Sequence, residues 1–390
     1  MKKVIYISYA VCAIAMFALL FYMFDHLRVI ESNTREDNEY TQLQPYRTWV
    51  VKDSGAPIGV SKVFQFKVPA IGKGTKTLAF YSHHQDVVIY KGDKVIYQRR
   101  VYQGNPFGRT SGQGWNDLTL YSEDSGKILT VVMSPEYSTV QGIDVTFYYG
   151  SKIKIWLHDV IRQLAPSILS LIAIVMGMIF VVFILVNIRN KKINRNLLFM
   201  GIFSICIGVW KITDAGILQL LFGNNILFSY IPFVSLLLCV IPFVLFMRTL
   251  FTDRESKGWY IVCLASLAVM VFSFVVQILN KGDMRETLPF NHAVMGVMAL
   301  VTVVQVVRQW KKQGMNRKLK LIFCCFLTCI VGLIGDTITF YTTEGMGSMV
   351  FGIFGFIIFT IIVGINSMAE SRALMARGEQ AEQLEKMAYH

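Results

Sequence analysis

Seven apolar segments follow one another between residues 164 and 367, separated by short polar loops. They span residues 164–187, 196–222, 226–247, 259–279, 290–307, 319–341 and 349–367. Each is close to the roughly 20 residues that an α-helix needs to cross a bilayer. The chain has a mean hydropathy of +0.49, which is too apolar for an ordinary soluble protein. We therefore expect a membrane protein with a seven-helix transmembrane bundle over residues 164–367.

The basic residues concentrate in alternate loops of this block. If the N-terminus is cytoplasmic, the three cytoplasmic loops hold thirteen Lys and Arg residues, and the external loops hold only Lys281 and Arg285. Cytoplasmic loops of membrane proteins carry such an excess of positive charge. The pattern predicts a multi-pass protein of the cell membrane with both termini in the cytoplasm and residues 25–163 outside. It also accounts for the net charge of +13 without a nucleic-acid partner.

The N-terminus begins with Lys2 and Lys3 before an apolar run over residues 4–24. The apolar core of a signal peptide is about 7–15 residues long, which is shorter than this run. Residues 21–24 (FYMF) also offer no small-residue cleavage site. We expect a retained transmembrane anchor over residues 1–24, with a cleaved signal peptide as the alternative. The polar residues 25–45 are expected to form a stalk.

Residues 46–150 change to short alternating runs that are typical of strands. Phe64, Phe66 and Val68 share one face of an alternating run, and residues 87–97 predict a hairpin around a glycine-containing turn. Several such runs separated by turn residues indicate an extracellular all-β sandwich or jelly roll. None of the seven cysteines lies between residues 25 and 162, so we expect a domain that needs no disulfides.

Two further segments flank the membrane block. Residues 151–163 have apolar positions near helical spacing and are expected to form a juxtamembrane connector. Residues 368–390 are mostly strong helix formers. Leu374, Ala381, Leu384 and Ala388 follow a 7-3-4 spacing that fits a short coiled coil, although Arg377 interrupts it. This signalling helix would join two copies of the chain in a homodimer.

The β-domain contains aromatic, amide and imidazole side chains of the kinds that bind sugar rings, through apolar stacking and directed hydrogen bonds. The candidate ligand contacts are Tyr81, His83, Gln85, Tyr102, Trp115 and Tyr137. The alternative is that the tyrosines and Trp115 belong to the core or to a dimer surface. His83 and its neighbour His84 would point to opposite faces of a strand, so we expect no metal site there.

Three ionisable residues lie inside apolar segments: Lys211, Asp214 and Asp336. Such groups are costly in a bilayer, so they pair or line a cavity. We expect Lys211 to pair with Asp336 in the outer half of the bundle, with Asp214 one turn further out. This arrangement would be a polar pocket or a switch between two helices, and the alternative is a plain interhelical salt bridge.

The order of these parts resembles the bacterial seven-transmembrane receptors with diverse intracellular signalling modules (DISM receptors). Within the β-domain, residues 90–97 (YKGDKVIY), 107–110 (FGRT), Trp115 and 126–128 (GKI) resemble galactose-binding-like jelly rolls. Residues 384–390 (LEKMAYH) resemble the segment that enters a GGDEF diguanylate cyclase domain, and no GGDEF-type motif occurs in the chain. The resemblance implies the sensor half of a receptor that controls cyclic di-GMP synthesis in the bacterial plasma membrane.

These observations favour a receptor module that senses an extracellular small molecule or carbohydrate and relays the signal through the helices. We identify no catalytic residue, cofactor or metal site in the sequence. The competing hypothesis is a membrane transporter or channel with an extracellular β-domain, which intramembrane charges would suit. A third hypothesis, an adhesion module on a passive anchor, does not explain seven helices.

Overall fold

The computed structural model describes residues 40–52, 55–101, 109–141, 143–187, 197–223, 225–251, 256–314, 317–342 and 350–388. The chain divides into two units, residues 1–39 and 40–390. The expected anchor at 1–24 and most of the expected stalk lie outside the described residues.

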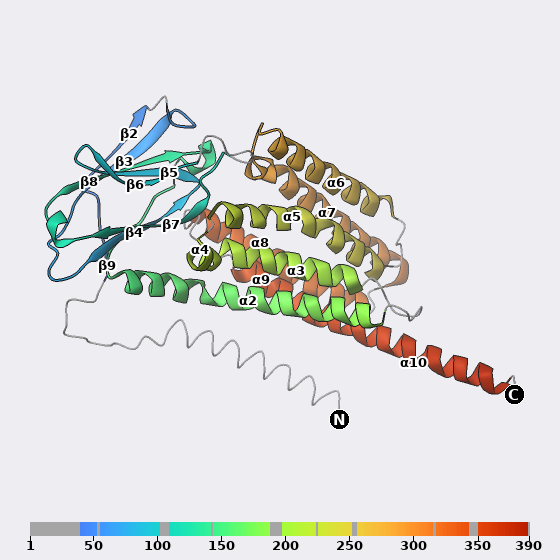
Figure 1. The fold of residues 1–390 in the computed structure, drawn as a ribbon. Coiled ribbons are helices and arrows are strands. Elements are labelled where there is room, and N and C mark those ends of the chain that lie inside the picture. Colours follow the sequence, from blue (N-terminus) through green and yellow to red (C-terminus); the bar gives the residue numbers. More distant parts are fainter. Residues whose placement is uncertain are drawn as a thin grey trace. The chain divides into compact units, whose positions relative to one another are not determined.

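Residues 41–150 form two antiparallel sheets, and the described residues include nine strands. One sheet has the order β1-β9-β4-β7 and the other has the order β2-β3-β8-β5-β6 (Figure 1). The strands are β1 (Thr41–Gln42), β2 (Arg47–Lys52), β3 (Val60–Lys67), β4 (Lys76–His83), β5 (Gln85–Lys91), β6 (Lys94–Arg99), β7 (Gln113–Leu120), β8 (Ile128–Pro135) and β9 (Phe147–Gly150). Alternating inward side chains of both sheets meet in one core, which confirms the expected all-β domain.

Phe147 lies at the centre of this core. Its ring centroid is 4.5 Å from that of Phe66, 5.0 Å from Phe64 and 4.8 Å from Phe80, so it contacts residues of both sheets. The hairpin expected over residues 87–97 is confirmed as β5 and β6, joined at a turn in which Gly92 has a φ of +61°. Strand β1 lies within the expected stalk, where Thr41 and Gln42 pair with Tyr149 and Tyr148 of β9.

Among the described residues, six helices are long and apolar enough to cross a membrane. They include α2 (Lys152–Val186), α3 (Leu197–Asp214), α5 (Asn225–Leu250), α6 (Lys257–Ile278) and α7 (Met284–Gln313). The sixth combines α9 (Val350–Phe359), the π-helical turn η4 (Thr360–Gly364) and the start of α10 (Ile365–Ala388). Helix α8 (Arg317–Thr342) occupies the remaining expected segment. A multi-pass bundle is therefore confirmed, and a count of seven spans stays a prediction.

Two expected boundaries differ from the structure. The connector at 151–163 and the first apolar segment form one continuous 35-residue helix, α2. The second segment, expected as one helix over 196–222, is divided into α3 and the short α4 (Ile217–Phe222). The break occurs because Gly216 adopts a φ of +82°, a conformation that ends a helix and suits glycine.

Candidate functional site at the junction of the β-domain and the helices

Among the polar contacts between the β-domain and the helices, two groups of residues stand out because each contains a buried side chain that bonds across the junction. We call the first group, Arg109, Tyr137, Tyr230, Gln277 and Asp283, the Asp283 junction. It joins two loops of the β-domain to α5, α6 and α7.

Asp283 is the acceptor at the centre of the Asp283 junction. It is the N-cap residue of α7, and its side chain is buried. The Arg109 backbone N–H donates to both carboxylate oxygens, at 3.3 and 3.2 Å, and the Tyr137 hydroxyl donates to Oδ2. The Tyr230 hydroxyl and Gln277 Nε2 donate to Oδ1 at 3.1 and 3.0 Å. One carboxylate thus accepts hydrogen bonds from the β-domain and from two neighbouring helices.

Surrounding groups hold this carboxylate and its donors in place. The backbone N–H of Asp283 donates to Glu286 Oε2 at 2.8 Å, which completes a capping box at the start of α7. Gln277 accepts the backbone N–H of Met284 at 2.8 Å. The Arg285 guanidinium lies 5.4 Å from the centre of the Tyr137 ring. Burial, followed by the negative charge of Asp283, raises the pKa of Tyr137, so its hydroxyl remains a hydrogen-bond donor.

The β-domain contains a pair of carboxyl groups next to Tyr137, because Glu136 directly precedes this residue in the chain. Asp86 and Glu136 are hydrogen-bonded to each other, and Asp86 Oδ1 accepts the backbone N–H of Val101 at 3.3 Å. Burial, followed by the charge of Asp86, raises the pKa of Glu136 to about 9. The charge of Asp283 contributes to this rise in the pKa of Glu136, and the charge of Arg109 opposes it. The pair therefore holds a proton at neutral pH, and losing that proton would add a negative charge beside Asp283.

This pair predicts a pH dependence of stability. The pKa of Glu136 lies above its ordinary value of 4.5, so the folded chain binds this proton more tightly than the unfolded chain. The resulting stabilisation is fully present below about pH 4.5 and is lost as the pH rises towards 9. We expect the melting temperature of the full chain in nanodiscs to fall between pH 6 and pH 9. Glu136→Gln should flatten this slope, and Glu123→Gln, at an exposed position, should not. If the melting temperature of Glu136→Gln depends on pH as strongly as that of the unmodified chain, the Asp86–Glu136 pair is not the cause of this dependence.

The second group, which we call the Tyr81 junction, contains Tyr81, Trp115, Asp159, Asp214 and Gln219. Trp115 Nε1 donates to Asp159 Oδ2 on α2 at 2.8 Å, and the Tyr81 hydroxyl donates to Gln219 Oε1 on α4 at 3.3 Å. The ring centroids of Tyr81 and Trp115 are 5.9 Å apart. Burial raises the pKa of Tyr81, and the nearby negative charges of Asp214 and Asp159 raise it further. The Tyr81 hydroxyl is therefore a neutral donor to the helices.

The structure brings most of the expected ligand contacts to these two junctions. Tyr81 and Trp115 contact the helices at one junction and Tyr137 at the other, while the His83 ring lies 4.7 Å from that of Tyr81. Burial lowers the pKa of His83 to about 4, so this histidine is neutral at physiological pH. Gln85 lies deeper, with Nε2 3.5 Å from the carbonyl of Val140. Tyr102 lies outside the described residues. Their role in binding a ligand stays a prediction.

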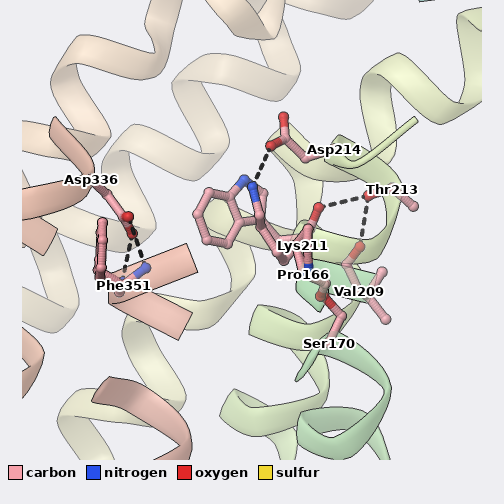
Figure 2. A network of polar contacts seen from close by, with 10 residues as sticks. Pro166, Ser170, Val209, Lys211, Thr213, Asp214, Asp336 and Phe351 are labelled. Carbon is pink, nitrogen blue, oxygen red and sulfur yellow. Dashed lines mark hydrogen bonds and ion pairs between the residues drawn. The ribbon is translucent and has the colours of Figure 1, made fainter. Parts of the chain in front are cut away.

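The expected Lys211–Asp336 pair is wrong. Lys211 Nζ lies 3.1 Å from Asp214 Oδ2, three residues along the same helix (Figure 2). Asp336 instead accepts the backbone N–H groups of Phe351 and Gly352 at 2.9 and 2.6 Å (Figure 2). It thereby caps the first turn of α9, where free N–H groups and the helix dipole favour a carboxylate. Sequence reasoning missed this use because residues 343–349 separate the two helices. Lys211 thus lies beside the Tyr81 junction through its contact with Asp214, whereas Asp336 joins α8 to the start of α9.

The central residue of the site, Asp283, was not among the sequence candidates. Its one local signal is the capping-box pattern formed by Asp283 and Glu286 before an apolar run. Among the parts of the chain that the structure describes, no three His, Cys, Asp or Glu side chains are placed to hold a metal ion. The arrangement of charges and donors suits a mechanical connection between the β-domain and the helices.

No protein-family model matches this chain, and none of the curated proteins is significantly similar to it.

Proposed function

We propose that this protein is a membrane signal receptor module in which the β-domain senses a ligand and the helices relay its state. The observation that carries the proposal is the position of Asp283. This one buried carboxylate accepts hydrogen bonds from Arg109 and Tyr137 of the β-domain, from Tyr230 of α5 and from Gln277 of α6. A change in the β-domain that moves Tyr137 must alter the hydrogen bonds at the start of α7.

Two continuous helices support a relay. Helix α2 begins directly after β9 and runs without a break for 35 residues, so a movement of the β-domain acts directly on this helix. Helix α10 continues the last membrane-capable helix beyond the bundle (Figure 1). In the proposed mechanism a shift of the bundle reorients α10, which pairs with a second copy as a short coiled coil. The bundle lies in the bacterial plasma membrane, with the β-domain outside and α10 in the cytoplasm.

The proposed ligand is an extracellular small molecule or carbohydrate. Tyr81, Trp115 and Tyr137 carry the groups that suit a sugar, and their polar atoms are engaged with the helices. A ligand that takes these hydrogen bonds competes with the helices, which links occupancy to the junctions. The strand order also supports a jelly roll, because successive strands lie in opposite sheets except at the β5–β6 hairpin and at β2, which is added at an edge.

We further propose that the chain belongs to the DISM receptor family, which the order of β-domain, helices and α10 favours, and that its output is a diguanylate cyclase that makes cyclic di-GMP. This part of the proposal rests on the resemblance of residues 384–390 to the entrance of a GGDEF domain. It is tested by fusing a diguanylate cyclase catalytic domain after His390 and measuring cyclic di-GMP. We expect the rate of synthesis to depend on Asp283, and equal rates in the Asp283→Asn fusion and the unmodified fusion would oppose this output.

A transporter is the second candidate, and buried polar groups between α5, α6 and α7 favour it. Thr287 and Ser273 hydroxyls lie 2.7 Å apart, and the fully buried Asn291 donates to the carbonyl of Leu236 at 3.3 Å. Polar groups inside a bundle can line a substrate path. These polar groups also bond to one another between helices, and such hydrogen bonds are equally typical of plain helix packing.

One experiment separates the two candidates. The full chain is reconstituted in proteoliposomes and challenged with a panel of radiolabelled monosaccharides, and binding and uptake are measured on the same samples. A receptor should bind one sugar without accumulating it inside the vesicles, and Trp115→Phe should weaken that binding. Uptake that depends on the protein would instead establish the transporter. Binding of no sugar would remove the carbohydrate proposal and leave other small molecules to be tested on the same site.

A further inference from the structure

A groove of about 570 Å³ lies between the start of α6 and the end of α7. Leu300, Val301 and Val304 of α7 form an apolar wall, and Leu300 and Val304 are exposed. The polar part of the lining comes from Ser256, Lys257, Gln305 and Arg308. The groove therefore combines an apolar strip on a membrane-capable helix with a charged end.

The charged end of the groove is positive. Lys257 begins α6 and Arg308 lies near the end of α7, and both side chains are exposed at the groove. The positive end of the α6 dipole lies at the same place. Beneath them, Gln305 Nε2 donates to the hydroxyl of Ser256, which joins the two helices. An anion seated between Lys257 and Arg308 would meet two cations and a helix N-terminus.

Two aromatic residues place this end of the groove at headgroup depth. Trp310 of α7 and Tyr260 of α6 are half exposed and lie within three residues of Arg308 and Lys257 respectively. Exposed Trp and Tyr residues gather at membrane–water interfaces, where one side of the ring is apolar and the other is wet. The apolar wall then extends from the headgroup level towards the membrane interior, as an acyl chain does.

We propose that this groove binds an anionic phospholipid, with its phosphate between Lys257 and Arg308 and one acyl chain along Leu300, Val301 and Val304. The combination of a positive end, an apolar strip and an interfacial position fits a lipid better than a soluble anion, which would use only the positive end. The site lies in the leaflet at the end of the bundle where α7 ends and α10 leaves the bundle (Figure 1). This inference does not depend on the proposed receptor function.

The test uses delipidated full-length protein in a neutral detergent, where no charged bilayer attracts lipid to the surface. Phosphatidylglycerol or phosphatidylcholine is titrated, and bound lipid is counted by native mass spectrometry. The variants are Lys257→Gln/Arg308→Gln, and Lys311→Gln/Lys312→Gln as a control with the same charge change outside the groove. We expect the first double variant to weaken phosphatidylglycerol binding roughly 30-fold and to lose the preference over phosphatidylcholine. The control should keep both.

Two further arms make the result decisive. Val304→Trp places a large side chain in the groove without changing the charge, and it should also weaken phosphatidylglycerol binding. This variant keeps the proposal testable if the double variant fails to fold. Inorganic phosphate at millimolar concentration should not displace the lipid. Equal losses in the two double variants, an unaffected Val304→Trp, or displacement by inorganic phosphate would each overturn the lipid site.

Discussion

Asp283→Asn should destabilise the full chain by about 3 kcal/mol, because it alters one buried acceptor that serves four donors. The asparagine side chain replaces one acceptor oxygen with an NH₂ group. This group would face hydroxyl and N–H donors that then lack a buried partner. The loss is measured by unfolding in mixed micelles with increasing SDS. It should be accompanied by faster hydrogen exchange around Arg109 and Tyr137.

The matched control is Glu286→Gln, three residues along α7. Glu286 is exposed, and glutamine keeps the capping-box hydrogen bond to the backbone of Asp283. It makes the same change of charge at the same helix end, and we expect an effect below about 0.5 kcal/mol. If the two variants lose equal stability, the effect comes from the charge at the helix end, and the Asp283 junction has no special role.

Gly177→Val should have an effect of similar size through backbone contact between α2 and α3. A Cβ atom at Gly177 would lie 2.6 Å from the carbonyl oxygen of Gly201 and 2.7 Å from the side chain of Ile205. The two helices must therefore separate to accept valine, and overpacking of this kind costs about 3 kcal/mol. We expect a loss of monodisperse protein in detergent, measured by size-exclusion chromatography. Unfolding should also occur at a lower SDS fraction.

Gly296→Val on α7 is the control for that variant. It places the same side chain in the middle of another membrane-capable helix, where a Cβ atom would meet nothing within 4 Å. Its stability should match the unmodified chain. If Gly177→Val behaves like Gly296→Val, then α2 does not depend on close contact with α3, and transmission from β9 through α2 into the bundle is no longer supported.

Local patterns were sufficient for the elements of the fold. The alternation of Phe64, Phe66 and Val68 and the glycine turn before β6 identified strands, because side chains in a strand alternate between a buried and a solvated face. The length of the apolar segments identified the helices, because a helix needs about 20 apolar residues to cross a bilayer. The break between α3 and α4 was missed because an apolar run resumes at Ile217 directly after Gly216, and only the backbone conformation of that glycine reveals it.

The site was much less predictable because its partners are distant in sequence. Asp283 accepts hydrogen bonds from Arg109 and Tyr137, which lie 174 and 146 residues before it. Tyr81 and Trp115 were identified as functional candidates from their chemistry, but their contacts with α4 and α2 could not be deduced from it. For Lys211, a partner on another helix was expected. Asp214 lies one turn away on the same helix, so the two side chains can pair without any contact between helices.

The proposed relay is tested most directly by hydrogen–deuterium exchange of the α10 backbone in nanodiscs. Unmodified protein, Asp283→Asn and Glu286→Gln are compared under the same conditions. If the β-domain controls the output helix through Asp283, then Asp283→Asn should change the protection of residues 365–388, far along the chain from the mutation, and Glu286→Gln should not. Faster exchange confined to Arg109, Tyr137 and the start of α7, with α10 unchanged, would contradict the relay.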